Sequence, residues 1–130
     1  MTRQSTVLMK RRCDMPSKPL PNCHDGHGAL DWVEVLGKQD VEGRAVNFVH
    51  DDVLAPGVTI GVHQHTHDEE YYFVLSGSGA MTLNEHRFEV GPGDITAVFP
   101  GGTHGLENTG DDDLRIIVFS VKTCAPNGSS

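Results

Sequence analysis

The stretch from Gly57 to Gly77, which reads GVTIGVHQHTHDEEYYFVLSG, constrains the fold of this chain more than any other. His63 and His65 occupy alternate positions in it, and a β-strand directs alternate side chains to one face, so the two imidazoles share a face. A short bend over residues 66–68 then returns the chain as a second strand, which brings Glu70 beside them. Two imidazoles and one carboxylate that converge from adjacent strands are typical of a divalent-metal site.

From Arg44 onward the chain reads as a series of short strands separated by turn residues, and it shows no helical periodicity. Regular short strands with glycine and proline turns are typical of an all-β barrel or jelly roll. The run Leu114–Val121 is apolar on both faces, which predicts that another sheet or a second subunit covers it on both sides. The predicted strands are Ala45–Val49, Val58–His65, Glu70–Leu75, Gly79–Leu83, Arg87–Val90, Asp94–Phe99, His104–Asn108 and Leu114–Val121.

The chain divides into three parts. Residues 1–43 form an N-terminal arm with the first strand or strands, residues 44–122 form the barrel, and residues 123–130 form a tail whose composition predicts disorder. The arm is either mobile or crosses to a second subunit, and the sequence leaves both possibilities open. With 130 residues, the chain is long enough for one hydrophobic core and too short for two.

Within the arm, Thr6–Met9 is a candidate short strand, and the residues around Trp32 indicate another. The prolines of residues 16–21 exclude a helix there and predict an extended segment. His24 and His27 flank a glycine turn. We interpret them as surface histidines, because no carboxylate lies nearby at ligand spacing.

The charge and the cysteines exclude several classes of function. A net charge of −8 argues against nucleic acid and against an anionic membrane surface as partners, since both need a surplus of Lys and Arg. No apolar run reaches transmembrane length, and the N-terminus lacks the apolar core of a secretory signal, so we expect a cytoplasmic protein. The three cysteines, Cys13, Cys23 and Cys124, are widely spaced and are interpreted as reduced thiols.

A second segment, Gly91–Asn108, completes the predicted ligand set. Pro100 and the two glycines after it form a tight turn that leads His104 into the start of a strand. In an antiparallel barrel this turn can place His104 opposite the strand of His63 and His65. Three imidazoles and one carboxylate suit one divalent transition metal such as Fe, Mn, Ni, Cu or Zn, whereas calcium and magnesium prefer more oxygens. Four protein ligands leave an octahedral ion two open positions, enough for a bidentate substrate or for substrate plus O₂.

These two segments resemble the two motifs of the cupin superfamily. The first motif is matched by Gly57, five residues, His63-Gln64-His65, four residues, Glu70, six residues and Gly77. The segment that resembles the second motif has Gly93, six residues, Pro100, Gly102, His104 and, after three more residues, Asn108. Between the turn glycine and the histidine this segment is one residue shorter than is usual in the motif. The match covers about residues 45–121. The resemblance implies a double-stranded β-helix, which is a small jelly-roll barrel, and commonly a homodimer. It also implies a metal held by His63, His65, Glu70 and His104.

Three further residues lie near the predicted ligands in the sequence. His67 shares the parity of His65, but the bend that follows turns it outward, so we expect it at the rim or in contact with a ligand histidine rather than as a ligand. Glu69 points away from Glu70 and is expected to be solvated, and it is the alternative ligand if the bend is one residue longer. Tyr72 has the parity of Glu70 and should face the cavity, either as a general acid or base or as a packed residue with one hydrogen bond.

Other barrel positions follow from strand parity. Thr96 and Val98 are expected to line the barrel near the metal. Arg87 and Arg115 are the only arginines in the barrel that could clamp a substrate carboxylate. The opposite face of the strand that carries Glu70 is expected to pack as core between sheets: Tyr71, Phe73 and Leu75.

The ligand set and the resemblance together predict a metal-dependent enzyme that acts on a small polar molecule, either a carboxylate or a sugar-derived compound. The metal would serve isomerisation, elimination or decarboxylation as a Lewis acid, and dioxygenation if it is iron. The main alternative is a non-catalytic, metal-containing module that binds or senses a small ligand, because no proton donor is unambiguous. A purely structural dimer is a third alternative, against which the four intact ligands argue. The fold alone does not choose among them.

Overall fold

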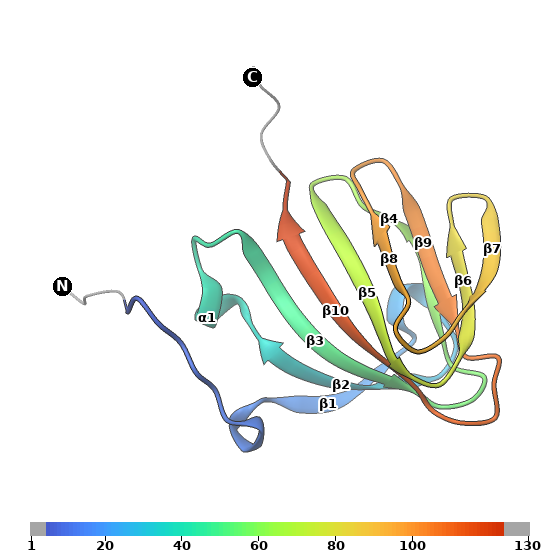
Figure 1. Cartoon of the computed structure of the whole chain (residues 1–130), viewed down its shortest axis with the longest axis horizontal. Coiled ribbons are helices and arrows are strands. Elements are labelled where there is room, and N and C mark those ends of the chain that lie inside the picture. Colours follow the sequence, from blue (N-terminus) through green and yellow to red (C-terminus); the bar gives the residue numbers. More distant parts are fainter. Residues whose placement is uncertain (1–4, 124–130) are drawn as a thin grey trace.

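The computed structural model describes residues 5–123 and confirms the all-β fold, a jelly-roll barrel. Two antiparallel sheets make up the barrel (Figure 1). The larger has the strand order β1-β2-β3-β10-β5-β8 and the smaller has the order β4-β9-β6-β7. The strands are β1 (Ser17–Pro21), β2 (Ala29–Leu36), β3 (Val46–Leu54), β4 (Thr59–Gln64), β5 (Asp68–Ser76), β6 (Gly79–Leu83), β7 (His86–Val90), β8 (Ile95–Val98), β9 (Thr103–Glu107) and β10 (Leu114–Lys122).

Three short helical segments accompany the strands: the 3₁₀ turns η1 (Arg12–Asp14) and η2 (Cys23–Asp25) and the helix α1 (Lys38–Val41), none of which the sequence analysis predicted. Within residues 5–123, no helix is long and apolar enough to span a membrane. The proline-rich segment forms β1, which pairs with β2 at the edge of the larger sheet. An edge strand tolerates proline because one side of it needs no partner. The expected strand at Thr6–Met9 is wrong, since this segment is extended without a strand partner.

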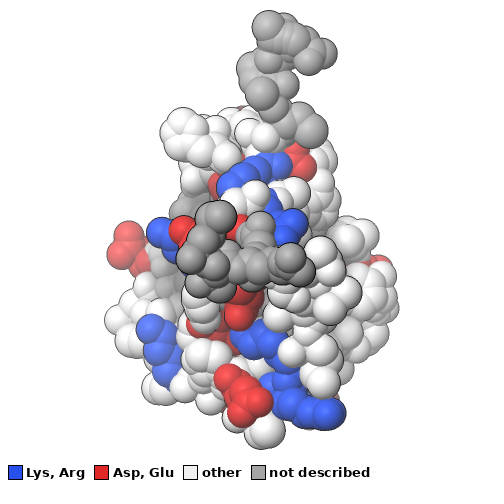
Figure 2. Space-filling model, turned by 90° about the vertical axis from the view of Figure 1, so that its left-hand side faces the viewer, with Lys and Arg blue, Asp and Glu red and all other residues white. Residues whose placement is uncertain are grey.

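Charged side chains attach the N-terminal segment to the larger sheet. Lys10 Nζ lies 2.7 Å from Asp40 Oδ2 of α1, and Arg12 Nη1 lies 2.8 Å from Asp51 Oδ2 of β3. Figure 2 shows Lys and Arg side chains interleaved with Asp and Glu side chains on the face that includes α1 and this segment. The described part of the arm therefore packs on the barrel of its own chain.

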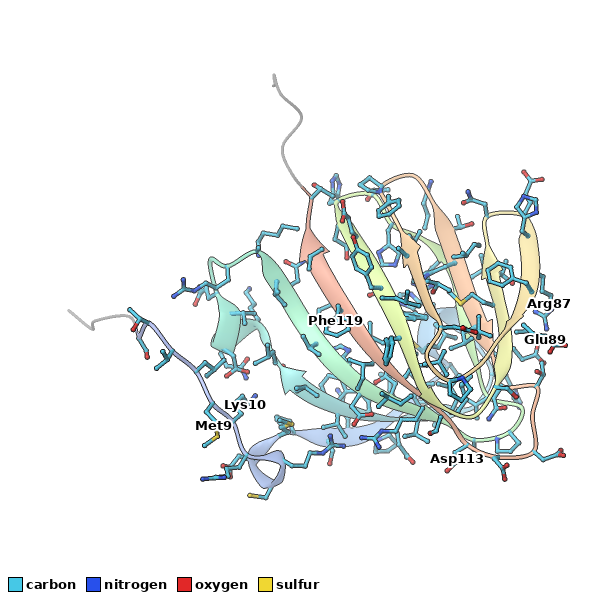
Figure 3. The ribbon with its side chains drawn as sticks, in the orientation of Figure 1. Met9, Lys10, Arg87, Glu89, Asp113 and Phe119 are labelled. Carbon is cyan, nitrogen blue, oxygen red and sulfur yellow. The ribbon has the colours of Figure 1, made fainter. Side chains whose placement is uncertain are left out.

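The hydrophobic core lies between the two sheets and includes Tyr72 and Val74 from β5 and Ile116 and Val118 from β10. The expectation that Tyr71, Phe73 and Leu75 form core between the sheets is wrong. Parity separated the two faces of β5 correctly, but the inward face is the one that carries Glu70, and Leu75 on the other face is 38% exposed. β10 also has an apolar side chain on its outward face: Phe119 points away from the barrel and is 36% exposed (Figure 3). Within residues 5–123, the chain covers one face of β10 rather than both.

Candidate metal centre

A bulge in β4 determines which of its side chains enter the barrel. Ile60 is buried and His63 also points inward, although residues three apart have opposite parity in a regular strand. The register of β4 against β9 shifts between these two residues, and Val62 is turned outward with 59% of its surface exposed. The backbone at Gly61 lies so close to the His24 carbonyl that a Cβ atom would overlap it. Glycine at position 61 therefore allows η2 to pack on the bulge.

The turn before β9 positions two of the predicted ligands. His104 pairs directly with His63 across β4 and β9, as the sequence predicted from that turn. The amide of His65 donates to the carbonyl of Gly102 at 3.0 Å, and the amide of Gly101 donates to the carbonyl of His65 at 2.7 Å. The turn that leads His104 into β9 therefore also holds the backbone of His65 in place.

The four predicted ligands come together, three from the smaller sheet and its flanking turn and Glu70 from β5 of the larger sheet. Their ligand atoms all lie within 4.8 Å of one another. His104 Nε2 lies 3.1 Å from His63 Nε2, 3.0 Å from His65 Nε2 and 3.0 Å from Glu70 Oε1. The same carboxylate oxygen lies 3.3 Å from His65 Nε2 and 3.9 Å from His63 Nε2.

These distances match a coordination shell better than a hydrogen-bonded cluster. A neutral imidazole carries one ring proton, so His104 Nε2 can donate to at most one of its three close neighbours. Two neighbouring ligands of an octahedral ion, each at about 2.0–2.2 Å from the metal, lie about 3 Å apart. The cluster is therefore able to hold a metal ion at its centre.

Hydrogen bonds at the far side of two rings prepare them for this role. His63 Nδ1 donates to the carbonyl of Gly61 at 2.7 Å, and His65 Nδ1 donates to Asp68 Oδ1 at 2.9 Å. Because both acceptors are oxygens without a proton, the ring proton lies on Nδ1 and the Nε2 lone pair faces the cluster. Ser120 Oγ in turn donates to Asp68 Oδ2 at 2.8 Å and holds the carboxylate in place.

The protonation states are those that metal binding requires. Burial alone would raise the pKa of Glu70, but the neighbouring His104 and His63 imidazoles lower it to about 2, so the carboxylate is ionised at neutral pH. Burial lowers the pKa of His104, which therefore stays neutral. A neutral His104 imidazole and an ionised Glu70 carboxylate can bind a divalent ion without first releasing protons.

Of the three other predicted site residues, Tyr72 contacts the cluster, whereas His67 and Glu69 do not point into it. Tyr72 is 4% exposed, and its ring centroid lies 4.6 Å from that of His104. Burial raises the pKa of Tyr72 well above its usual value, so the phenol keeps its proton and can donate a hydrogen bond. His67 is exposed in the bend between β4 and β5. Glu69 accepts a hydrogen bond from the Tyr71 hydroxyl at 2.9 Å and is directed away from the cluster.

Neither barrel arginine contacts the cluster. Arg115 Nε and Nη2 bind the two carboxylate oxygens of Asp51 at 3.0 and 2.7 Å. Arg87 Nη2 binds Glu107 Oε1 at 2.8 Å, and Figure 3 shows Arg87 at the outer edge of β7. The sequence had offered both as clamps for a substrate carboxylate, and each already has a carboxylate partner within the chain.

Sequence reasoning missed three residues at the site. His24, interpreted as a surface histidine, stacks on His63 with ring centroids 3.5 Å apart and planes 10° apart. The contact depends on how η2 packs on β4, which no spacing in the sequence indicates. His50 and Asp52 were missed because the predicted strand ended at Val49, whereas β3 continues to Leu54. With Asp52 on the same face as the buried Leu54, a longer strand would have revealed an acidic residue pointing into the barrel.

A cavity of about 120 Å³ lies beside the cluster, and Glu70, Tyr72, His50 and Asp52 are in its wall. The cavity wall therefore combines a predicted metal ligand, Glu70, with side chains that can donate hydrogen bonds, including Tyr72 and His50.

Comparison with known proteins identifies the family. The model of the cupin domain matches residues 51–120, which is more than half of the chain. The chain belongs to the cupin family. This cupin is 27% identical over 119 residues to the oxalate-binding protein of Thermotoga maritima, a match that covers 92% of this chain and 98% of that protein.

Solved structures agree on the fold. The cupin superimposes with a TM-score of 0.83 on a Thermotoga maritima protein described as a predicted oxalate decarboxylase, at 24% identity, covering 89% of this chain and 100% of the other. It superimposes with a TM-score of 0.64 on a cupin 2 conserved barrel domain protein from Salinispora arenicola, at 20% identity, covering 93% and 92% of the two chains.

Proposed function

We propose that this cupin holds one divalent transition metal, namely iron, manganese, nickel or zinc, through His63, His65, Glu70 and His104, and acts there on a small carboxylate. The convergence of three imidazole Nε2 atoms and one carboxylate oxygen at about 3 Å carries this proposal. A metal in this site would act as a Lewis acid with coordination positions open to ligand oxygens.

The carboxylate class of ligand is supported by the relatives. The Thermotoga maritima relative is named for oxalate binding, and the similar structure is described as a predicted oxalate decarboxylase. The cavity beside the cluster, at about 120 Å³, has room for a molecule of only a few non-hydrogen atoms. Decarboxylation is the reaction we favour, with isomerisation or elimination as related outcomes and dioxygenation if the metal is iron.

The residues of the site have different roles in this proposal. His63 and His65 keep their Nε2 lone pairs directed at the metal because Gly61 and Asp68 accept their Nδ1 protons. Tyr72 keeps its proton and lines the cavity, so we propose it as the acid or the orienting hydrogen-bond donor for the bound carboxylate.

A non-catalytic binding module is the second candidate, and the name of the Thermotoga maritima relative favours it. The two functions differ in one observable. A binding module retains oxalate unchanged on the metal, whereas an enzyme releases carbon dioxide and formate, or consumes oxygen, with repeated turnover.

The first experiment is elemental analysis of untagged protein purified without chelators, together with the His63→Ala and His104→Ala variants. We expect near-stoichiometric metal in the wild type and loss of metal in both variants. The loaded protein is then incubated with oxalate, and formate, carbon dioxide and oxygen uptake are measured. Wild-type protein that neither contains metal nor takes it up on addition would refute the proposal. Stoichiometric oxalate binding without product would establish the binding module.

We further propose that the chain pairs as a homodimer through the outward face of β5, β8 and β10. This face carries exposed apolar side chains, including Ile95 at 60%, Phe99 at 55% and Phe119 at 36% exposure. Light scattering during size-exclusion chromatography should give twice the chain mass, and Ile95→Lys should give the mass of one chain. A monomeric wild type would refute this pairing.

A further inference from the structure

The cavity beside the metal ligands contains an acidic residue, one of whose buried oxygen atoms has no hydrogen-bond partner among residues 5–123. Asp52 lies on the inward face of β3 and is 4% exposed. Its Oδ1 atom is buried and has no hydrogen-bond partner in the described part of the chain. The cavity that it lines also has Glu70 in its wall, so Asp52 and one of the candidate metal ligands face the same cavity.

The neighbouring residue, Asp51, is also a buried carboxylate but lies in a different environment. Asp51 is just as buried, but its carboxylate is bound by Arg115 and Arg12. These pairs, with the hydrogen bond to Arg115 the largest cause, lower the pKa of Asp51. Burial raises the pKa of Asp52 to about 7, and the charges of Asp51 and Glu70 add to the effect. An ionised carboxylate with neither counter-ion nor donor is strongly disfavoured in such a place, whereas a neutral carboxylic acid is not.

We propose that Asp52 is a ligand-binding residue that donates the hydrogen bond of its carboxylic acid to a carboxylate oxygen of a small mono- or dicarboxylate held at the metal cluster. This inference rests on the proposed function, in that it assumes a metal-bound carboxylate in the cavity. It identifies a residue that selects for the ligand and that none of the sequence motifs contains.

The other groups around the cavity suit this role. Among the described residues, no Lys or Arg is in its wall, so the charge that would bind a carboxylate there comes from the metal, and the other donors are neutral. His50 Nδ1 accepts a hydrogen bond from Trp32 Nε1 at 3.0 Å, which leaves the ring proton on Nε2. Burial lowers the pKa of His50 to about 4, so this ring is also a neutral donor at physiological pH. An ionised Asp52 would repel an anionic ligand, so protonation of this one residue and ligand binding favour each other.

Several other titratable groups face Asp52, and their protonation states have to be distinguished from that of Asp52. Cys23 from η2 has its pKa raised to about 11 by burial and by the charges of Asp52 and Glu70, and it stays a neutral thiol. Tyr72 from β5 stays protonated, as does the ring of His50 on Nε2. His24 from η2 also lines the cavity, and burial lowers its pKa. Asp52 is thus the group in this set whose charge changes near neutral pH.

The test measures oxalate binding to metal-loaded protein by calorimetry between pH 5.5 and 8.5, in two buffers of different ionisation enthalpy that report proton uptake. In the wild type, affinity should fall by up to tenfold per pH unit once the pH exceeds the pKa of Asp52 in the metal-loaded protein, and binding should take up as much as one proton there. The Asp52→Asn variant retains a donor but cannot titrate, so its affinity should lack this decrease and the proton uptake. The Asp52→Ala variant loses the donor and should bind roughly ten- to a hundredfold more weakly at pH 6.

Asp111→Asn is the matched control, because it changes the same functional group in an exposed loop and should reproduce the wild-type profile. Circular dichroism and metal content confirm that each variant is folded and loaded. If the wild type binds oxalate and Asp52→Asn shows the same pH profile and proton uptake, the role of Asp52 is refuted while the proposed function stands. If the loaded wild type binds no oxalate at any pH in this range, the proposed function itself fails, and the role of Asp52 fails with it.

Discussion

Replacing Asp52 with asparagine should stabilise the metal-free protein, and by more as the pH rises. In the unfolded chain this carboxyl ionises near its ordinary pKa of 3.8, whereas in the folded protein it ionises at about 7. Between these values the folded state holds one more proton than the unfolded state, so the contribution of Asp52 to stability decreases as pH increases. Each unit of pKa difference corresponds to about 1.4 kcal/mol, which gives about 4 kcal/mol over the full window and about 3 kcal/mol between pH 5 and pH 8.

Urea unfolding of chelator-treated protein measures this directly, with the fluorescence of Trp32, the only tryptophan, as the signal. Other groups that titrate in this range, histidines included, contribute equally to the wild type and to Asp52→Asn. The difference in unfolding free energy between the two should therefore grow by about 3 kcal/mol from pH 5 to pH 8, in favour of the variant. A difference that does not change with pH would show that Asp52 ionises normally in the fold.

Asp51→Asn provides a control of opposite sign. The pKa of Asp51 is lowered, with the hydrogen bond to Arg115 as the largest cause, so its stabilising effect is present above the unfolded pKa and is lost only as the pH falls below it. This variant should be less stable than the wild type throughout the range from pH 5 to pH 8, with a deficit that shrinks as the pH rises, because the charge of Asp51 contributes to the raised pKa of Asp52.

Three further predictions concern the metal cluster. His104→Ala should remove most of the bound metal while the far-ultraviolet circular dichroism stays that of the barrel, and full metal retention would exclude His104 as a ligand. Asp68→Asn, which removes the carboxylate that accepts the His65 Nδ1 proton, should weaken metal affinity about 10- to 100-fold in a competition titration with a chelator, and an unchanged affinity would show that this hydrogen bond does not orient the ring. Tyr72→Phe should keep its metal and lower turnover of a carboxylate substrate, whereas unchanged turnover would assign Tyr72 to packing.

The four candidate ligands could be predicted because their positions follow from local rules. His63 and His65 share a face by strand parity, and the turn that begins at Pro100 brings His104 opposite them. Glu70 follows after one short bend. Each of these steps spans only a few residues within its own segment, and the resemblance to the two cupin motifs supplied the pairing of the two segments. The all-β class followed for the same reason, from short apolar runs between glycine and proline turns.

Only the tertiary structure decided what surrounds the ligands. The bulge at Gly61 supplies the carbonyl that binds His63, and η2 packs against it from a distant part of the chain. The buried face of β5 is not the face of Tyr71, because the second sheet covers the opposite side of the strand. Strand parity separates two faces without saying which one is buried.

Asp52 shows the same limit most clearly. In the sequence, Asp51 and Asp52 are two adjacent acidic residues without a distinguishing feature. In the fold, Asp51 is bound by Arg12 and Arg115, whereas Asp52 faces the cavity and its Oδ1 atom has no hydrogen-bond partner in the described residues. The sequence by itself thus determined the fold class and the candidate metal ligands, because these depend on short-range periodicity. The charge state of each carboxyl was decided by the tertiary structure, because burial and partners come from residues far away in the chain.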